Sequence, residues 1–497
     1  MSRVRSPYSV KDCRAIDSLR IRARAERRKE SSVGNSGAGD GAGKIKILVD
    51  NGEYWLRDRG DIAMMVMTVE RLRERWPHAR IGMLTDEPHI LRGVLPQAEP
   101  VVANSGGDWG RSGLAGWLEE TAGLHVLGPA AMRWRSATEV PKHYLRGAKD
   151  WVRKEVHVLS TGERKPEPAG MPDLPPVPGA LADADLVIAQ GGGYMTDVDL
   201  YQAHRTLNLL EAAQRRGIPN VMIGQGMGPM RDRELLRRAA EVLPGADLIA
   251  LREGRRGPRL LAELGVAADR ILVTGDDAVE FAYRLRRPCI GTDLGLCLRI
   301  SDDFKVSDSA RDTLGAVVRR EAAELNTSLA PLIISEYDDE DRRHTLPLLA
   351  GAVRTRPAIG RAGTAQEVAR QVSRCRVLVT SAYHLAVFAL SQGIPAVAVT
   401  ASQYYDDKFY GLADMFGADA AGEGLRIVHL DVDNLDGELS RAIRQLWESA
   451  PELRDALQQR AAEQIDANRA GLDRVYGLLA GGAGLPGGSA EPVQGEG

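Results

Sequence analysis

The chain has 497 residues, of which 43% are hydrophobic and 27% charged, and its formal net charge is −3. A chain of this length is too long for one compact core, so we predict two domains. The weak net charge gives no general reason to expect nucleic-acid binding. No apolar run reaches the ~20 residues of a membrane-spanning helix, and the basic N-terminus lacks the apolar core of a secretory signal. The four cysteines form no CxxC pair, so we expect a reducing, cytoplasmic setting.

Strands and helices are predicted to alternate after a basic, flexible tail over residues 1–43. The first half of the chain has predicted strands at 44–50, 81–85, 185–190, 221–223, 247–251 and 271–273. A stretch from about 104 to 180 is rich in Gly, Pro and Trp, and we interpret it as an insertion that could cover a site. The alternation is typical of a doubly wound parallel sheet, so we predict an N-terminal Rossmann-like domain over 44–287.

The second half of the chain repeats this alternation. Strands are predicted at 293–298, 332–335, 376–380 and 396–400. The helical pattern of 452–478 is expected to pack on the body of the protein and could cross back to the first domain. We therefore predict a C-terminal Rossmann-like domain over 288–480, followed by a flexible tail over 481–497. The fold class is α/β, with the two domains facing each other across a cleft.

Polar residues follow two neighbouring predicted strands in the stretch 376–408. His384 opens a helix directly after the first strand, and Tyr405 and Lys408 follow the second. Ligands bind at the carboxyl edge of open α/β sheets. A histidine in the first turn of a helix has a lowered pKa, which keeps the imidazole neutral and able to exchange a proton. We therefore select His384 as a catalytic candidate, with a satisfied core histidine as the alternative.

Glycines follow two predicted strands of the first domain. Gly191, Gly192 and Gly193 stand where a strand meets a helix, and their amides could approach an anion with the assistance of the helix N-terminus. A tight turn is the alternative, but three glycines in a row after a buried strand favour a ligand. Gly226 belongs to the segment Gly224–Pro229, which likewise places glycines directly after a predicted strand. The spacing does not match a dinucleotide fingerprint, so no nicotinamide cofactor is expected.

Charged residues end other predicted strands. Arg252 and Arg299 each end a strand, where a guanidinium suits a carboxylate or phosphate; a structural salt bridge is the alternative for each. Asp276 is expected to bind hydroxyls or cap the following helix. His204 could face the same cleft as a second catalytic candidate, or lie at the surface. No metal-ligand spacing is visible, so we predict no metal.

In combination, these residues resemble the polysaccharide pyruvyl transferase family. The matching pieces run in family order from about residue 45 to 420: Asn51, Gly60-Asp61, Gly191–Gly193 with Asp197, Gly224–Pro229, Arg252-Glu253, Gly275-Asp276 with Phe281, Arg299, Ser381–His384, Gly393–Pro395 and Tyr405–Lys408. The resemblance implies a fold similar to GT-B glycosyltransferases. It also implies transfer of the pyruvyl group of phosphoenolpyruvate to a sugar as a ketal, in polysaccharide or glycoconjugate biosynthesis. The expected partners are this donor and a sugar acceptor, without a further cofactor.

Two residues match positions with a known role in the family, and one residue differs from the family's usual motif. His384 matches the catalytic histidine of the family's Ser-Arg-x-His motif, and Arg252 matches an arginine that holds the donor. Ala382 stands where the family usually has arginine. Arg299 or Lys408 could replace that charge; otherwise the donor differs or the activity is lost. A nucleotide-sugar glycosyltransferase and a non-catalytic binding protein therefore stay open as alternatives, as do the acceptor and the oligomeric state.

Overall fold

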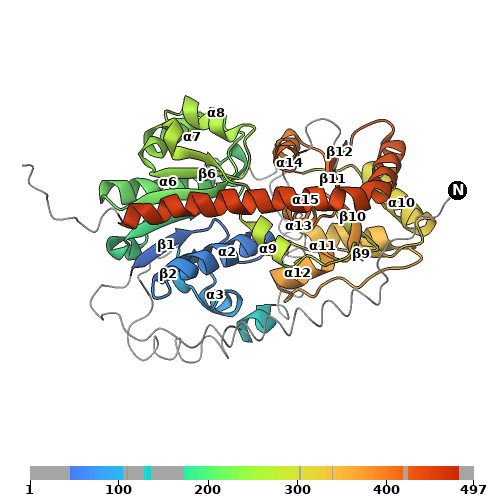
Figure 1. Ribbon diagram of the computed structural model, residues 1–497, viewed down its shortest axis with the longest axis horizontal. Helices are drawn as coiled ribbons and strands as arrows, with labels where there is room; N and C mark the ends of the chain where they lie inside the picture. The colour runs from blue at the N-terminus through green and yellow to red at the C-terminus, as the bar shows by residue number, and fades with distance from the viewer. Residues whose placement is uncertain are drawn as a thin grey trace, which may run out of the picture.

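Two parallel sheets lie side by side in the computed structural model, which describes residues 45–103, 109, 128, 130–135, 173–301, 304–337, 340–417 and 424–480 (Figure 1). The first sheet contains β1 (Lys46–Asp50), β2 (Arg80–Thr85), β3 (Glu99–Val102), β4 (Leu186–Gln190), β5 (Asn220–Gln225), β6 (Leu248–Leu251) and β7 (Ile271–Val273). The second sheet contains β8 (Asp293–Cys297), β9 (Leu329–Pro331), β10 (Cys375–Thr380), β11 (Ala396–Thr400) and β12 (Leu425–His429). We call the part built on each sheet the N-lobe and the C-lobe. The predicted tails, 1–43 and 481–497, and most of the predicted insertion lie outside the described residues.

Helices connect the strands of both sheets. The N-lobe has α2 (Arg59–Arg75), α3 (Pro88–Val94), α6 (Leu200–Arg215), α7 (Arg233–Val242), α8 (Gly257–Glu263) and α9 (Ala278–Arg284). The C-lobe has α10 (Asp308–Glu324), α11 (Glu340–Thr345), α12 (Ala365–Val372), α13 (Tyr383–Ser391), α14 (Gln403–Met415) and α15 (Leu435–Ala480). Every strand pair is parallel. The predicted α/β class with two Rossmann-like units is therefore confirmed.

The strand order locates where each sheet can bind a ligand. The N-lobe order is β3-β2-β1-β4-β5-β6-β7, so the chain reverses direction across the sheet between β1 and β4. The C-lobe order is β12-β11-β10-β8-β9, so its reversal lies between β8 and β10. Doubly wound sheets bind ligands at such switch points, at the carboxyl ends of the strands. The loops after β1, β4, β8 and β10 are therefore the places to look for a site.

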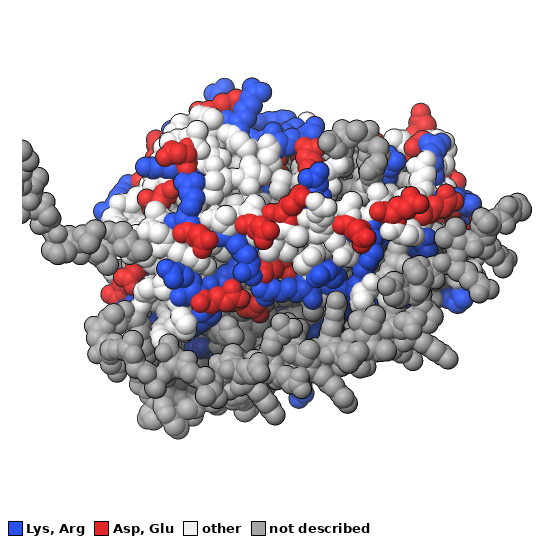
Figure 2. Space-filling model, in the orientation of Figure 1, with Lys and Arg blue, Asp and Glu red and all other residues white. Residues whose placement is uncertain are grey.

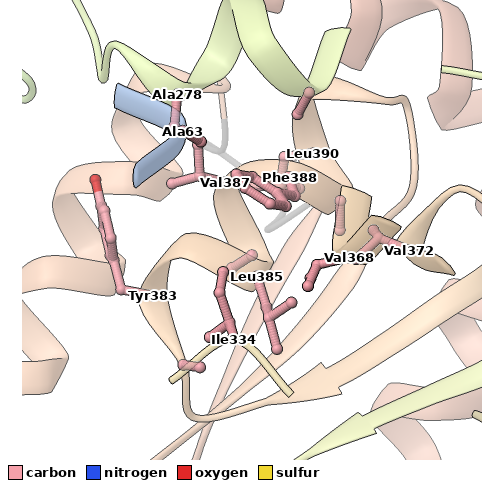
Figure 3. Packing of buried hydrophobic residues seen from close by; sticks show 14 of the residues in the cluster. Ala63, Ala278, Ile334, Val368, Val372, Tyr383, Leu385, Val387, Phe388 and Leu390 are labelled. Atoms are coloured by element: carbon pink, nitrogen blue, oxygen red, sulfur yellow. The ribbon is translucent and has the colours of Figure 1, made fainter. Parts of the chain in front are cut away.

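Helix α13 forms the centre of the interface between the lobes. It is apolar on all sides, and every one of its residues is buried except His384, which is partly exposed. Val387 packs near Ala63 of α2 and Ala278 of α9, while Leu385 and Leu390 continue the same cluster (Figure 3). Burial of such aliphatic side chains stabilises the fold by about 1.5–3 kcal/mol each. Hydrophobic packing thus fixes His384 at the boundary between the two lobes.

One predicted strand is misplaced by three residues. The strand occupies Leu329–Pro331, and the end of the predicted segment 332–335 forms an antiparallel bridge to Asp58 of the N-lobe. The amide of Arg59 donates to the carbonyl of Ile334 (2.9 Å), and the amide of Glu336 donates to the carbonyl of Arg57 (3.1 Å). The start of the run stays bonded to the C-lobe sheet, since the amide of Leu332 donates to the carbonyl of Leu296 (2.9 Å), and only its end bonds across to the N-lobe. The edge strands β3 and β12 were not predicted.

The last helix, α15, runs across both lobes (Figure 1). It is longer than the predicted 452–478 and contains Pro451, which has no N–H to donate. The carbonyl of Trp447, four residues earlier, accepts a hydrogen bond from Arg376 Nε (2.8 Å). Basic and acidic side chains alternate over the face that α15 crosses in Figure 2. Within the described ranges no helix, α15 included, is long and apolar enough to cross a membrane.

A buried charge network ties α15 to the N-lobe. Arg71 of α2 donates from Nη1 to Asp277 (3.0 Å) and to Asn468 of α15 (2.6 Å), and from Nη2 to Glu280 (2.8 Å). Asn468 also donates to Asp277 (2.6 Å). Arg71 is 3% exposed, so its charge is compensated by the two carboxylates and not by water. The predicted crossing of this helix back to the first half of the chain is therefore present.

Replacing Arg71 with methionine should lower the free energy of unfolding by roughly 3–5 kcal/mol, because Asp277 and Glu280 would be left buried without a counter-charge. Denaturant unfolding at neutral pH measures this change. The matched control is Arg237→Met, which removes two ion pairs on the exposed face of α7 and should leave the midpoint near that of the wild type. Equal shifts in both variants would show that the buried network contributes nothing special.

Candidate active site

Residues from both switch points meet at the boundary between the lobes. The loop after β1 supplies Asp58 and the start of α2, the turn after β8 supplies Arg299, and the turn after β10 supplies His384. Asp276 comes from the loop between β7 and α9. These residues lie far apart in the sequence, and the two parallel sheets bring them together because each stands at a carboxyl end of a strand.

Asp58 connects the lobes through its two carboxylate oxygens. Oδ1 accepts from the amide of Gly60 (2.8 Å) and caps α2. Oδ2 accepts from Arg299 Nη2 (3.2 Å), and Arg299 Nε donates to the fully buried Asp341 (2.7 Å). The structural salt bridge left open as an alternative for Arg299 is thus present. Arg299 holds Asp58 in place, and its binding of a substrate anion stays a prediction.

His384 faces a group of carboxylates and not the core. Its Nε2 lies 3.7 Å from Asp276 Oδ2 and 4.0 Å from Asp61 Oδ1, and its Nδ1 lies 3.9 Å from Asp58 Oδ1. These distances are too long for hydrogen bonds. Among the described residues, His384 Nε2 and Asp276 Oδ2 have no hydrogen-bond partner. Two buried polar atoms that lie 3.7 Å apart, each without a hydrogen-bond partner, indicate a place for a ligand or a proton.

The environment of His384 keeps its ring neutral. Burial lowers the pKa of His384 to about 4, assisted by the positive charges of Arg252, Arg299 and Lys408 and opposed by Asp276. The ring also packs against Gly60, where any side chain would collide with it. The sequence anticipated a neutral histidine from the helix dipole, and in the structure burial also lowers the pKa. At neutral pH the imidazole is therefore unprotonated, with a free lone pair on one ring nitrogen.

Arg252 and Lys408 line a small pocket between the lobes, together with Gly193, Gly226 and other residues. The Arg252 guanidinium lies over the Tyr383 ring (4.3 Å to its centroid) and 3.8 Å from Asp276 Oδ2. Lys408 Nζ lies 3.8 Å from the centroid of the Tyr404 ring, and the Tyr404 hydroxyl donates to the carbonyl of Gly193 (2.9 Å). Arg256, Glu253 and Asp407 also line the pocket, and Arg256 pairs with Asp407 (2.5 Å). Arg252 from the N-lobe and Lys408 from the C-lobe are therefore the cations that could hold an anion there.

The glycines after β4 serve different purposes. Gly191 has no room for a Cβ because the carbonyl of Gly224 occupies that space, and Gly192 packs against the Tyr194 ring. Gly193 alone lines the pocket. The expectation that a helix N-terminus assists these amides is wrong, because α6 begins only at Leu200. The amide of Gly226 is also occupied, since it donates to the carbonyl of Gly192 (3.0 Å).

Two predicted site residues have other surroundings. Tyr405 is 7% exposed and stacks edge-on against Phe304 (centroids 4.8 Å apart), so most of its surface belongs to the core. His204 lies on α6, and its pKa is lowered by burial, with Glu234 and Arg238 of α7 as its charged neighbours. The charged groups that act most on His384 are Asp276, Arg252, Arg299 and Lys408, and none of them is among those that act most on His204. The structure therefore does not place His204 beside His384.

Asp61 and Asp58 are the site residues that the sequence did not select. One ligand atom from each of Asp58, Asp61 and His384 lies within 4.8 Å of the others, close enough to surround a cation. Arg299 already compensates Asp58, and Arg252 and Lys408 add positive charge nearby, so we do not assign these side chains as metal ligands. The sequence did contain a signal for them: both follow the first predicted strand, and Gly60-Asp61 is one of the pieces that resemble the family.

Comparisons with known proteins add a family and a fold. The family model described as polysaccharide pyruvyl transferase matches residues 59–403. A solved UDP-N-acetylglucosamine 2-epimerase is similar to the chain, with 13% identity over 90% of this chain and 100% of that chain and a TM-score of 0.51. At this identity the likeness supports the predicted GT-B-like fold alone.

Two further solved structures are similar at lower scores. They are the UDP-GlcNAc 2-epimerase from Neisseria meningitidis (12% identity, 88% of this chain, 100% of that chain, TM-score 0.47) and a glycosyltransferase from Rickettsia africae (8% identity, 89% of this chain, 100% of that chain, TM-score 0.47). No curated protein matches the chain.

The lowered pKa of His384 makes a prediction about stability. Between pH 6.5 and about 4, the unfolded chain binds a proton at this ring that the folded protein does not bind. The free energy of unfolding of the wild type should therefore fall as the pH drops through this window, by about 1.4 kcal/mol for each unit of pKa difference. In His384→Gln this contribution is absent, so the stability difference between the two proteins should change with pH below 6.5 and level off above it.

Denaturant unfolding at several pH values measures this difference, with the exposed His78→Gln as control. A difference between wild type and His384→Gln that is constant from pH 4 to 7 would contradict the neutral, buried ring.

Proposed function

The chain belongs to the polysaccharide pyruvyl transferase family, and from this premise we propose that it transfers the pyruvyl group of phosphoenolpyruvate to two hydroxyls of a sugar. The products are a ketal and inorganic phosphate. The observation that carries the proposal is the chain of close contacts from Arg252 through Asp276 to His384. Asp276 Oδ2 lies 3.8 Å from the guanidinium and 3.7 Å from the imidazole, so a donor held by Arg252 would present its reacting carbon near His384.

The pocket of Arg252 and Lys408 is the proposed donor site. Phosphoenolpyruvate carries a phosphate and a carboxylate, and two cations from opposite lobes could each hold one of them. Ala382 stands at the start of α13 in place of the family's usual arginine, and it is fully buried. Lys408 is the residue best placed to supply the missing charge, because it reaches Gly193 at the same pocket. Arg299 is less suited, since its guanidinium is engaged by Asp341 and Asp58.

His384 is the proposed acid–base group for the acceptor. A neutral imidazole with a pKa of about 4 can take the proton of an attacking hydroxyl at neutral pH. General base catalysis of this kind contributes about 10²–10⁴-fold to a rate. Positioning of the donor by fixed cations supplies a further part of the catalysis.

The direct test combines protein, phosphoenolpyruvate and a panel of glycosides with two free neighbouring hydroxyls. Phosphate release that depends on both substrates, and a ketal detected by mass spectrometry, are expected. UDP-N-acetylglucosamine serves as the comparison ligand in a thermal-shift experiment. Stabilisation by the nucleotide sugar and none by phosphoenolpyruvate would overturn the proposal in favour of a glycosyltransferase.

Arg252→Met should weaken donor binding, because each charge-assisted hydrogen bond contributes about 1.5–3 kcal/mol, or roughly 10–150-fold. We expect a smaller thermal shift with phosphoenolpyruvate and a matching fall in kcat/KM. Arg255→Met is the matched control, since Arg255 is 45% exposed and pairs with the exposed Asp414. Equal donor affinity in the two variants would remove Arg252 from the donor site.

Gly226→Ala should disturb the donor site without removing any functional group. A Cβ at this position would lie 2.6 Å from Nε and Nη2 of Arg252 and would displace the guanidinium. We expect a raised KM for phosphoenolpyruvate with a smaller change in kcat. Gly477→Ala on α15, where a Cβ meets no atom within 4 Å, is the control and should behave as wild type. Unchanged donor KM in Gly226→Ala would mean that the position of Arg252 is unimportant.

A further inference from the structure

The proposed reaction needs an acid as well as a base, and this inference rests on that proposed function. A proton must reach the methylene carbon of phosphoenolpyruvate before its C2 can accept two oxygens. His384, with a pKa of about 4, does not hold a proton at neutral pH in the donor-free site. The acid must therefore be another group that lies within reach of the same reacting atoms.

Asp61 occupies the right place for such an acid. Its Oδ1 lies 4.0 Å from His384 Nε2, on the first turn of α2 and directly after Gly60, which packs against the imidazole. Its side chain is 22% exposed, so it is more open to the site than Asp58 (9%) and Asp276 (1%). Within the described part of the chain, its carboxyl makes no hydrogen bond and no ion pair with Lys or Arg. Asp58, by contrast, is committed to Arg299 and to the cap of α2.

The charges around Asp61 favour its protonated form. The groups that face it are Asp58 and Glu53 from the loop after β1, Asp276 before α9, Arg252 after β6, Tyr194 after β4, Tyr337 after β9, and His384 on α13. Burial raises the pKa of Asp61 well above its ordinary value, and Asp58 and Glu53 raise it further, while Arg252 opposes them. Carboxylates crowded together cannot all ionise, so one of them keeps a proton. Asp61 has the fewest compensating bonds and is the natural holder of that proton.

We propose that Asp61 is the catalytic acid that protonates the methylene carbon of the enolpyruvyl group, opposite His384 as the base. Two titratable groups whose surroundings push their pKa values in opposite directions are the usual signature of an acid–base pair.

The proton count closes over one turnover. Asp61 gives its proton to the methylene carbon, the π electrons form the new C–H bond, and C2 becomes electron-deficient. The first acceptor hydroxyl forms a C2–O bond, and its proton passes to His384. The bond from C2 to the phosphate oxygen then breaks, and the departing phosphate takes the proton from His384. The second hydroxyl forms the other C2–O bond, and its proton returns to Asp61, so both groups end as they began.

The first test is Asp61→Asn, which keeps the shape of the side chain but has no acidic proton. We expect phosphate release to fall by about 10²–10⁴-fold while the thermal shift with phosphoenolpyruvate is kept, because a carboxyl is lost and no cation. Asp61→Glu, which restores a carboxyl, should recover part of the rate and the alkaline limb of the pH–rate profile. Asp414→Asn, on the exposed side of α14, is the control and should match the wild type. Wild-type turnover in Asp61→Asn would overturn the proposal.

The second test does not depend on turnover. The difference infrared spectrum between wild type and Asp61→Asn should contain the carbonyl band of a protonated carboxyl at pH 6, and this band should disappear as the pH rises. Absence of the band would overturn the acid assignment even in an active enzyme. If the band is present but phosphoenolpyruvate gives no phosphate with any acceptor, the proposed reaction is wrong, while the conclusion that Asp61 carries the proton of the site is kept. Saturable binding of Mn²⁺ that Asp61→Asn abolishes would also overturn the assignment, because a cation would then replace the proton.

Discussion

The ion pair between Asp58 and Arg299 is the contact on which the arrangement of the site depends. It joins the start of α2 in the N-lobe to the end of β8 in the C-lobe, and Asp341 holds the other side of the guanidinium. The same carboxylate caps α2. One side chain thus caps a helix of one lobe and binds the other lobe. Because Asp61 lies in the first turn of that helix, this contact and the packing of α13 together set its distance to His384.

The surroundings of the site explain how one small volume can hold groups of opposite proton affinity. His384 is buried and lies near the positive charges of Arg252, Arg299 and Lys408, so the neutral ring is favoured although Asp276 opposes it. Asp61 is surrounded by other carboxylates, so the neutral acid is favoured. Burial acts on both groups, and it disfavours the charged form in each case. The two pKa values therefore move apart for one common reason, and the local charges add to the separation.

Much of this organisation could be predicted from sequence, because strands, helix ends and glycine positions are local properties. Arg252, Lys408 and His384 were selected since each follows a strand of a predicted parallel sheet, and the structure places all three at the lobe boundary. Asp61 was overlooked because its importance depends on which charges surround it, and two of those charges, Arg252 and Asp276, come from distant segments of the chain. The segment 332–335 was misassigned for a related reason: the carbonyl of Ile334 accepts from Arg59 of the other lobe, and the amides of Ile334 and Ser335 donate to the side chain of Asp341 instead of a strand.

The path of α15 has a consequence for how substrates enter. Beyond Pro451, this helix is bound to both lobes: Gln458 donates to the carbonyl of Gln392, and Asn468 joins the network of Arg71 and Asp277. A hinge that separated the lobes widely would have to break these bonds or bend the helix. The backbone hydrogen bonding of α15 is already interrupted at Pro451. Pro451 precedes both Gln458 and Asn468 in the helix, so a bend there would not separate these two contacts. Access to the pocket therefore favours a small rotation about the axis of α15 over a wide opening of the two halves.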